Sequence, residues 1–389
     1  MDKRHLIKAL AAAPLAISLP QAWAQNKPFK VGLLAPMTGP FASTGRQMDA
    51  GVRLYMKLNG TTVAGRKIEV ILKDDAGTPD VTKRLAQELV VNEKVDVLAG
   101  FGLTPLALAT APIATQSKTP MVNMLAATSM VINSTPYMVR TSMTLPQITL
   151  GMGEWAAKNN MRRTVTLVTD YGPGLDAERT FKERMALNGG QVIESLRVPL
   201  RNPDFAPFLQ KVRDLKPDAL FVFVPSGVGS LVMKQFVERG LAKAGIKLIG
   251  TGEIVDDDLL SQMGDEAIGV VSSYPYSAAH PSALNKKFVA EFKKMHNIRP
   301  NAVGVFAYDG MHVIYEALRK TGGKGGGDAL MAAMKGQIFE SPRGQVLIDA
   351  NTRDIVQSVF IRKTERVNGE LYNIEFSEEK DVRDPKPVR

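Results

Sequence analysis

Short apolar segments alternate with amphipathic segments along most of the chain, beginning near residue 29. Residues 29–34 form a mostly apolar run with the length of a buried strand, whereas residues 45–58 carry Met48, Val52 and Tyr55 at helical spacing. The alternation continues with predicted strands at 68–73, 95–99 and 120–124 and predicted helices at 79–92 and 105–116. Such an alternation predicts a parallel sheet with helices on both faces.

A second series of the same kind begins after Leu145. Its predicted strands cover 164–169, 191–195, 219–224, 247–250 and 270–274, and its predicted helices cover 175–187, 204–215 and 229–239. Two successive open α/β sheets predict two lobes, with a ligand cleft at the carboxyl ends of the strands. The charged tail at 377–389 is predicted to fray.

The N-terminal residues have the order of an export signal. A basic segment is followed by an apolar run at 9–19, which is too short to span a bilayer, and by small residues before Gln25. We therefore predict a signal peptide at 1–24 and a periplasmic protein. No later run of 18 apolar residues free of charge follows, so the mature chain is expected to be soluble.

Composition excludes several classes of protein. The chain has 389 residues, enough for two domains, and a net charge of +10. It has few aromatic residues and no basic block, so we predict no nucleic-acid partner. It contains no cysteine, which excludes disulfides, thiol chemistry and a lipoprotein anchor.

Motifs for catalysis, metal binding and cofactor binding are also missing. None of the four histidines has a metal-type partner at helical spacing, and the first strand lacks the glycine-rich turn of a dinucleotide site. The glycine-rich segment 322–327 lacks Lys-Ser/Thr and follows a predicted helix, so we interpret it as a loop. The acidic run 256–258 has no further spaced ligands and is interpreted as a solvated loop and helix cap. We predict no enzyme, no metal and no cofactor.

Two polar turns follow neighbouring strands and suit a charged small molecule. At the first turn, Thr104 is predicted to be the N-cap of a helix and Pro105 its first residue. Free backbone N–H groups and the helix dipole favour a carboxylate at such a turn, although a well-capped helix explains the same residues. The second turn spans residues 125–129. Two such turns at adjacent strand ends favour a pocket.

Several segments occur in an order that resembles the leucine/isoleucine/valine-binding protein family across nearly the whole mature chain. They read VGLLAPMTGPFASTG, DDAGTPDVTKRLAQELV, VLAGFGLTPLALATAPIA, AATS, VTDYGPG, IGTGEI and FAYDGMHVIYEAL. The resemblance implies a type I periplasmic binding protein, an α/β fold of two Rossmann-like lobes with parallel sheets joined by a three-strand hinge. Chain crossings near Thr141, Tyr274 and Ile348 would give one lobe from 28–141 with 276–348. The other lobe would combine 142–275 with 349–389.

The resemblance also implies the site residues. Thr104 matches the residue that holds the ligand's carboxylate, while Ala126 (by its backbone carbonyl) and Thr128 match positions that bind carboxylate and ammonium. Glu253 matches the acid that pairs with the ammonium. Four further residues complete the site. The resemblance places Tyr171 over the ligand and Tyr308 at the cleft mouth, and the apolar loop with Phe101 and Leu103 is expected to line the site.

The implied function is capture of a small carboxylate-bearing solute by hinge closure, for delivery to the membrane subunits of an ABC permease. A carboxylate such as Glu253 in the cleft favours a zwitterion, so we predict an amino acid of the branched-chain type bound by a monomer. The apolar loop and Ser226, in place of a common tyrosine, leave aromatic acids such as benzoate or cinnamate derivatives as the alternative. A ligand-sensing ectodomain without transport is a second alternative.

Overall fold

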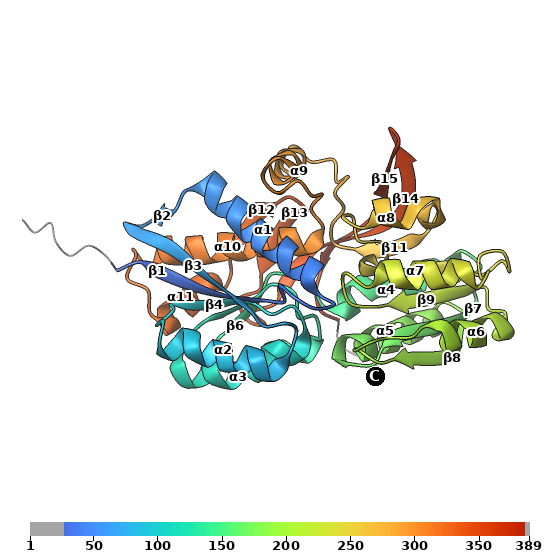
Figure 1. Cartoon of the computed structure of the whole chain (residues 1–389), viewed down its shortest axis with the longest axis horizontal. Coiled ribbons are helices and arrows are strands. Elements are labelled where there is room, and N and C mark those ends of the chain that lie inside the picture. The colour runs from blue at the N-terminus through green and yellow to red at the C-terminus, as the bar shows by residue number, and fades with distance from the viewer. Residues whose placement is uncertain (1–26, 386–389) are drawn as a thin grey trace, which may run out of the picture.

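A computed structural model describes residues 27–385, which form two α/β lobes that lie side by side (Figure 1). The predicted signal peptide lies outside these residues. The lobe that begins with β1 also contains α10 and α11 from late in the sequence, so the chain leaves this lobe and returns to it. No helix within the described residues is long and apolar enough to cross a membrane.

The first sheet has six strands in the order β2-β3-β1-β4-β5-β6. All neighbours are parallel except β2 and β3, which form an antiparallel pair joined by a tight turn. The strands are β1 (Phe29–Ala35), β2 (Thr62–Val63), β3 (Arg66–Asp74), β4 (Val97–Gly100), β5 (Met121–Asn123) and β6 (Met138–Arg140).

Helices cover both faces of this sheet, as the apolar pattern predicts. α1 and α10 lie on one face, and α2 and α3 lie on the other (Figure 1). Side chains of β1 alternate between these faces, because Val31 and Leu33 join the core under α1 and α10 whereas Leu34 packs with α2 and α3. The helices of this part are α1 (Ala42–Asn59), α2 (Pro79–Val91), α3 (Thr104–Ser117), η1 (Ser129–Ser134), α9 (Ala283–His296), α10 (Ala302–Lys320) and α11 (Gly327–Met334).

The second sheet has nine strands and is mixed. Its order is β12-β13-β14-β11-β10-β9-β7-β8, with β15 also paired to β14. β7 to β11 are parallel neighbours, whereas β12 to β15 join antiparallel. The strands are β7 (Arg163–Thr169), β8 (Gln191–Val198), β9 (Ala219–Phe223), β10 (Lys247–Thr251), β11 (Val271–Tyr274), β12 (Ile338–Ser341), β13 (Gly344–Ile348), β14 (Ile355–Val367) and β15 (Glu370–Val382).

The helices of the second lobe again divide between two faces. Phe221 and Phe223 of β9 pack toward α4 and α5, whereas the alternate residues Leu220 and Val222 pack toward α6 and α7. These helices are α4 (Leu145–Lys158), α5 (Gly172–Leu187), α6 (Ala206–Leu215) and α7 (Gly229–Glu238), followed by η2 (Gly252–Val255), α8 (Leu260–Met263) and η3 (Gly264–Ala267).

Two expectations about the second sheet are wrong. It is not purely parallel, because β12 to β15 are joined by short turns, and a short turn allows only antiparallel pairing. The tail does not fray from residue 377, because β15 runs to Val382 along β14. Asp384 beyond it accepts hydrogen bonds from the Ser129 and Thr144 hydroxyls at 2.8 and 2.5 Å.

The chain near Thr141 is fixed by Arg343, which comes just before β13. Its guanidinium donates to the carbonyls of Thr141 and Ser142 at 2.6 and 3.1 Å and pairs with Asp309 at 2.9 Å. β12 and β13 fall in the range predicted for the first lobe, yet their hydrogen bonds continue the second sheet. The predicted lobes, 28–141 with 276–348 and 142–275 with 349–389, stay a prediction.

Both sheets have the same winding. In each parallel series the second strand in chain order pairs with one edge of the first strand, and the third strand pairs with the other edge. The winding therefore reverses between β1 and β4 in one lobe and between β7 and β9 in the other. Open α/β sheets bind ligands at such a switch point, beyond the carboxyl ends of the strands.

Candidate functional site

A narrow cavity lies between the lobes, beyond the carboxyl ends of strands at both switch points. The first lobe contributes loops that follow β4 and β5, and the second lobe contributes loops that follow β7, β9 and β10. Its free volume is about 20 Å³, room for about one water molecule, so a larger ligand requires the lobes or the wall side chains to move. The lining residues are Gly102, Leu103, Thr104, Leu125, Ala126, Ala127, Met143, Leu145, Tyr171, Phe223, Pro225, Ser226 and Glu253.

Thr104 places a hydroxyl at the start of α3. The N-cap of this helix is Leu103, so the prediction that Thr104 is the N-cap is wrong, and no side-chain cap is formed. The Thr104 hydroxyl instead contacts the Thr128 hydroxyl at 3.0 Å and accepts from the Thr128 N–H at 3.4 Å. The two predicted polar turns therefore meet.

The same turns present neutral hydrogen-bond donors to the cavity. The backbone N–H groups of Thr104 and Ala127 donate to no acceptor within residues 27–385. The amino end of α3 adds a partial positive charge next to them. No Lys, Arg or His of the described chain lines the cavity. A carboxylate at this end would therefore be held by N–H and hydroxyl groups and by the helix dipole.

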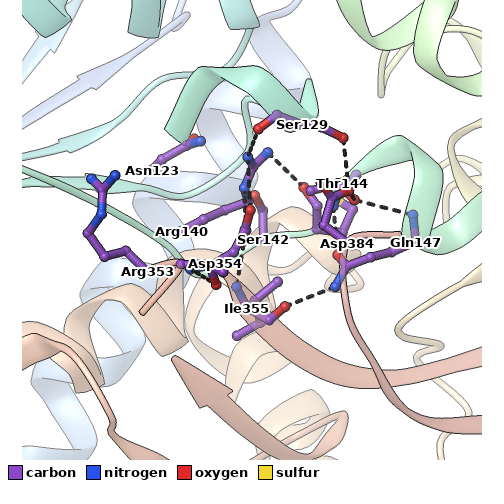
Figure 2. Close-up of polar contacts among 12 residues, drawn as sticks. Asn123, Ser129, Arg140, Ser142, Thr144, Gln147, Arg353, Asp354, Ile355 and Asp384 are labelled. Atoms are coloured by element: carbon purple, nitrogen blue, oxygen red, sulfur yellow. Dashed lines mark hydrogen bonds and ion pairs between the residues drawn. The ribbon is translucent and has the colours of Figure 1, made fainter. Parts of the chain in front are cut away.

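The turn after β5 is held rigidly by the buried guanidinium of Arg140 (Figure 2). Arg140 donates to the carbonyls of Ala126 and Thr128 at 2.9 and 3.0 Å, and its Nε lies 2.7 Å from Asp354. The Ala126 carbonyl also accepts from the Asn123 amide at 2.7 Å. A carbonyl oxygen has two lone pairs, so an ammonium at Ala126 would have to compete with two existing hydrogen bonds.

The middle of the cavity is apolar and aromatic. Tyr171, just before α5, stacks on Phe223 with the ring centroids 6.1 Å apart and 19° between the planes. Leu103 packs against Tyr171 from the opposite lobe. Flat apolar walls of this kind suit a planar ring as well as an aliphatic side chain.

Glu253 follows β10 and brings a carboxyl group to the cavity wall. It is only 2% exposed, and its Oε2 has no hydrogen-bond partner within the described residues. Burial raises the pKa of Glu253 to about 7, against the lowering effect of the Arg362 guanidinium. Gly252 allows this position, because a Cβ there would lie 2.2 Å from the Tyr274 ring and 2.5 Å from Arg362.

Asp256 and Asp257 are buried, so the interpretation of the acidic run as a solvated loop is wrong. Asp256 accepts from the Ser226 hydroxyl at 2.6 Å and from the Gly227 N–H at 3.0 Å. Asp257 accepts from Asn373 at 3.1 Å and lies 3.7 Å from Arg362. Partners from distant strands therefore replace the solvent. Within residues 27–385 no cluster of metal-binding side chains occurs.

The lobes touch at two edges of the cavity. The Thr44 hydroxyl of α1 donates to the Ser226 carbonyl at 3.1 Å. On the other edge, a Cβ added to Gly172 would lie 2.5 Å from the Thr128 hydroxyl. These contacts join opposite lobes, so moving the lobes apart would break them.

Five of the predicted site residues line the cavity, namely Leu103, Thr104, Ala126, Tyr171 and Glu253. Thr128 joins them through its bond to Thr104. The structure places two others elsewhere. Phe101 packs in the core beneath α2 and α3. Tyr308, on α10, packs against Tyr55 of α1 and Phe288 of α9.

Sequence reasoning did not identify the apolar wall residues Leu125, Met143, Leu145 and Phe223 as site residues. Met143 and Leu145 lie where the chain passes between the lobes, which no local motif marks. Phe223 does carry a signal, because it lies at the carboxyl end of a predicted parallel strand, where ligands bind.

Two lobes that close on a cavity at their switch points define a solute-binding protein. The family model for periplasmic binding proteins matches residues 28–369, and the chain belongs to this family. The Leu/Ile/Val-binding protein homolog 6 of Brucella melitensis is 39% identical over 385 residues, which cover 97% of this chain and 99% of that protein.

Solved structures show the same fold. A solute-binding protein of an ABC transporter from Rhodopseudomonas palustris BisB5, in complex with 3,4-dihydroxybenzoic acid, is 60% identical with a TM-score of 0.91. Another from R. palustris, in complex with 4-hydroxybenzoate, is 39% identical with a TM-score of 0.89. Each alignment covers 92% of this chain and 98% of the other. The predicted family, two-lobed fold and ABC transporter solute-binding role are confirmed.

Proposed function

We propose that the chain binds a small aromatic carboxylate, a benzoic acid with ring hydroxyls, in the cavity between its lobes. The observation that carries this proposal is the pairing of neutral donors at the start of α3 with apolar, aromatic walls. The donors suit the carboxylate, and the walls suit the ring. The relative that is 60% identical and was solved with 3,4-dihydroxybenzoic acid supports the same ligand class.

An amino acid is the second candidate, and Glu253 favours it. A buried carboxylate with a free oxygen is a good partner for an ammonium group. Two features weigh against it. The Ala126 carbonyl, the other expected ammonium ligand, already accepts two hydrogen bonds. Burial also raises the pKa of Glu253 to about 7, so a neutral Glu253 can lie beside an anionic ligand without repulsion.

The proposed cycle is binding in the open cleft, closure of the second lobe, and recognition of the closed form by the permease membrane subunits. In this proposal the protein acts in the periplasm as a monomer and as a binding protein rather than an enzyme. Contacts of the ligand with both lobes favour the closed state.

A thermal-shift panel tests the ligand class on the mature chain. 4-Hydroxybenzoate or 3,4-dihydroxybenzoate should raise the melting temperature and L-leucine should not, since a ligand at 100 times its Kd adds about 2.7 kcal/mol of stability. A shift with L-leucine and none with the aromatic acids contradicts the proposal.

A pair of variants on α3 locates the carboxylate. Thr104→Val should weaken binding by about 1.5–3 kcal/mol, because a hydrogen bond to a charged group is lost. Thr110→Val is the matched control, because the Thr110 hydroxyl donates to the Leu106 carbonyl within the same helix and lies outside the cavity. Equal affinities of the two variants would remove Thr104 from the site.

A further inference from the structure

The second lobe brings one acidic group, Glu253, to the cavity wall and places a second, Asp256, behind Ser226. Glu253 and Asp256 are each 2% exposed. Each also has one carboxyl oxygen, Oε2 of Glu253 and Oδ1 of Asp256, without a hydrogen-bond partner in the described part of the chain. Buried polar atoms are nearly always satisfied, and Glu253 lines the cavity, so its free oxygen points to a group that a ligand supplies.

Ser226 connects Asp256 to the cavity. It lines the cavity, is 5% exposed and donates its hydroxyl proton to Asp256 at 2.6 Å. A serine hydroxyl has one proton and two lone pairs. Because the proton is directed to Asp256, the Ser226 oxygen can only accept from a ligand.

The two acceptors, Oε2 of Glu253 and the Ser226 oxygen, lie on the same side of the cavity. Both residues line it, and they follow β10 and β9, which are neighbouring strands of the second sheet. The free backbone N–H donors lie at α3 in the other lobe, so the carboxylate end of the ligand belongs there. The two acceptors select for neighbouring O–H donors at the other end of the ligand. A ring without these donors leaves both acceptors unpaired.

We propose that Ser226, positioned by Asp256, and Glu253 are specificity-determining residues that accept hydrogen bonds from two adjacent hydroxyls on an aromatic ring. This assignment rests on the proposed binding of aromatic carboxylates. It predicts the affinity order 3,4-dihydroxybenzoate, then 4-hydroxybenzoate, then benzoate. Glu253 accepts a hydrogen bond from the 4-hydroxyl, which the first two acids share, and Ser226 accepts one from the 3-hydroxyl.

Calorimetric titration of the mature chain with these three acids tests the assignment. Ser226→Ala should lower the preference for 3,4-dihydroxybenzoate over 4-hydroxybenzoate roughly five- to tenfold, the value of one hydrogen bond, and leave benzoate affinity unchanged. Glu253→Gln should lower the preference for 4-hydroxybenzoate over benzoate.

Two controls separate hydroxyl recognition from other effects. Ser195→Ala removes a serine of β8 that does not line the cavity and should change none of the three affinities. Thr44→Val removes the hydrogen bond to the Ser226 carbonyl and should weaken all three acids by the same factor, because it acts on lobe closure.

The assignment is overturned if Ser226→Ala keeps the wild-type preference or weakens all three acids equally. Failure of the proposed function looks different, since the wild-type protein would then bind none of the three acids.

Discussion

At the scale of single residues, Glu253 distinguishes the two candidate ligand classes by its protonation state. Its pKa is raised to about 7 by burial, so closure over an anion favours the protonated form. Closure over an ammonium favours the ionised form instead. Binding of an anion is therefore coupled to proton uptake at Glu253, and binding of an ammonium ligand is coupled to proton release.

The pH dependence of affinity follows from this linkage. Between about pH 8 and about pH 6, affinity for 4-hydroxybenzoate should rise as pH falls, because the complex takes up a proton at Glu253. Titration calorimetry at several pH values measures this slope, and Glu253→Gln should flatten it. Affinity that falls toward pH 6 and recovers above pH 7 would identify a ligand with an ammonium group.

Residue roles were predictable from sequence only where the local chain carries the signal. Thr104, Leu103 and Glu253 follow strands that the apolar pattern marks, and all three line the cavity. The acidic run after Glu253 was misread as solvated. Its partners Ser226, Asn373 and Arg362 lie far away in the sequence, and no local pattern shows that they satisfy buried carboxylates.

At the scale of elements, the turn after β5 depends on Arg140 more than on its own sequence. The Arg140 guanidinium lies between the carbonyls of this turn and Asp354, which precedes β14 (Figure 2). Burial raises the pKa of Asp354, and Arg140 opposes that shift. The pair thus ties the carboxylate end of the cavity to the segment that leads into β14.

Arg140→Met should lower the free energy of unfolding by about 3–5 kcal/mol, because it leaves the buried Asp354 without its cation. Urea denaturation measures the change. Arg84→Met is the matched control, because the Arg84 side chain is 67% exposed and 3.9 Å from Glu88, and it should change stability by no more than about 0.5 kcal/mol. Equal effects of the two variants would contradict the role given to Arg140.

Most helices and strands of both parallel series were predicted from apolar periodicity, within three residues of their ends, whereas β6 and α4 were not predicted. Predicted 79–92 became Pro79–Val91, and predicted 219–224 became Ala219–Phe223. The antiparallel strands β12 to β15 were not predicted. β15 carries many charged residues on an exposed edge, so its pairing with β14 leaves no continuous apolar run to detect.

At the scale of the whole molecule, binding depends on how closely the lobes approach. Gly172 at the start of α5 lies against Thr128 of the other lobe, with space for no Cβ. Its backbone is not in the left-handed region, so a substitution there changes the contact without straining the chain.

Gly172→Ala should weaken binding of every ligand by about 1–3 kcal/mol, the usual effect of overpacking, and should leave the stability of the open, ligand-free protein unchanged. Gly151→Ala is the matched helix control, because its new Cβ would meet nothing nearer than 3.5 Å. Small-angle scattering with and without 4-hydroxybenzoate measures closure. A Gly172→Ala protein that still compacts like wild type would show that this contact does not limit closure.

A crystal structure of the mature chain with 3,4-dihydroxybenzoate tests the proposed binding mode. We expect the carboxylate at Thr104 and the amino end of α3, the ring between Leu103 and Tyr171, and the hydroxyls against Glu253 and Ser226. A ligand bound outside this cavity, or with its carboxylate against Glu253, would show that the proposed binding mode is wrong.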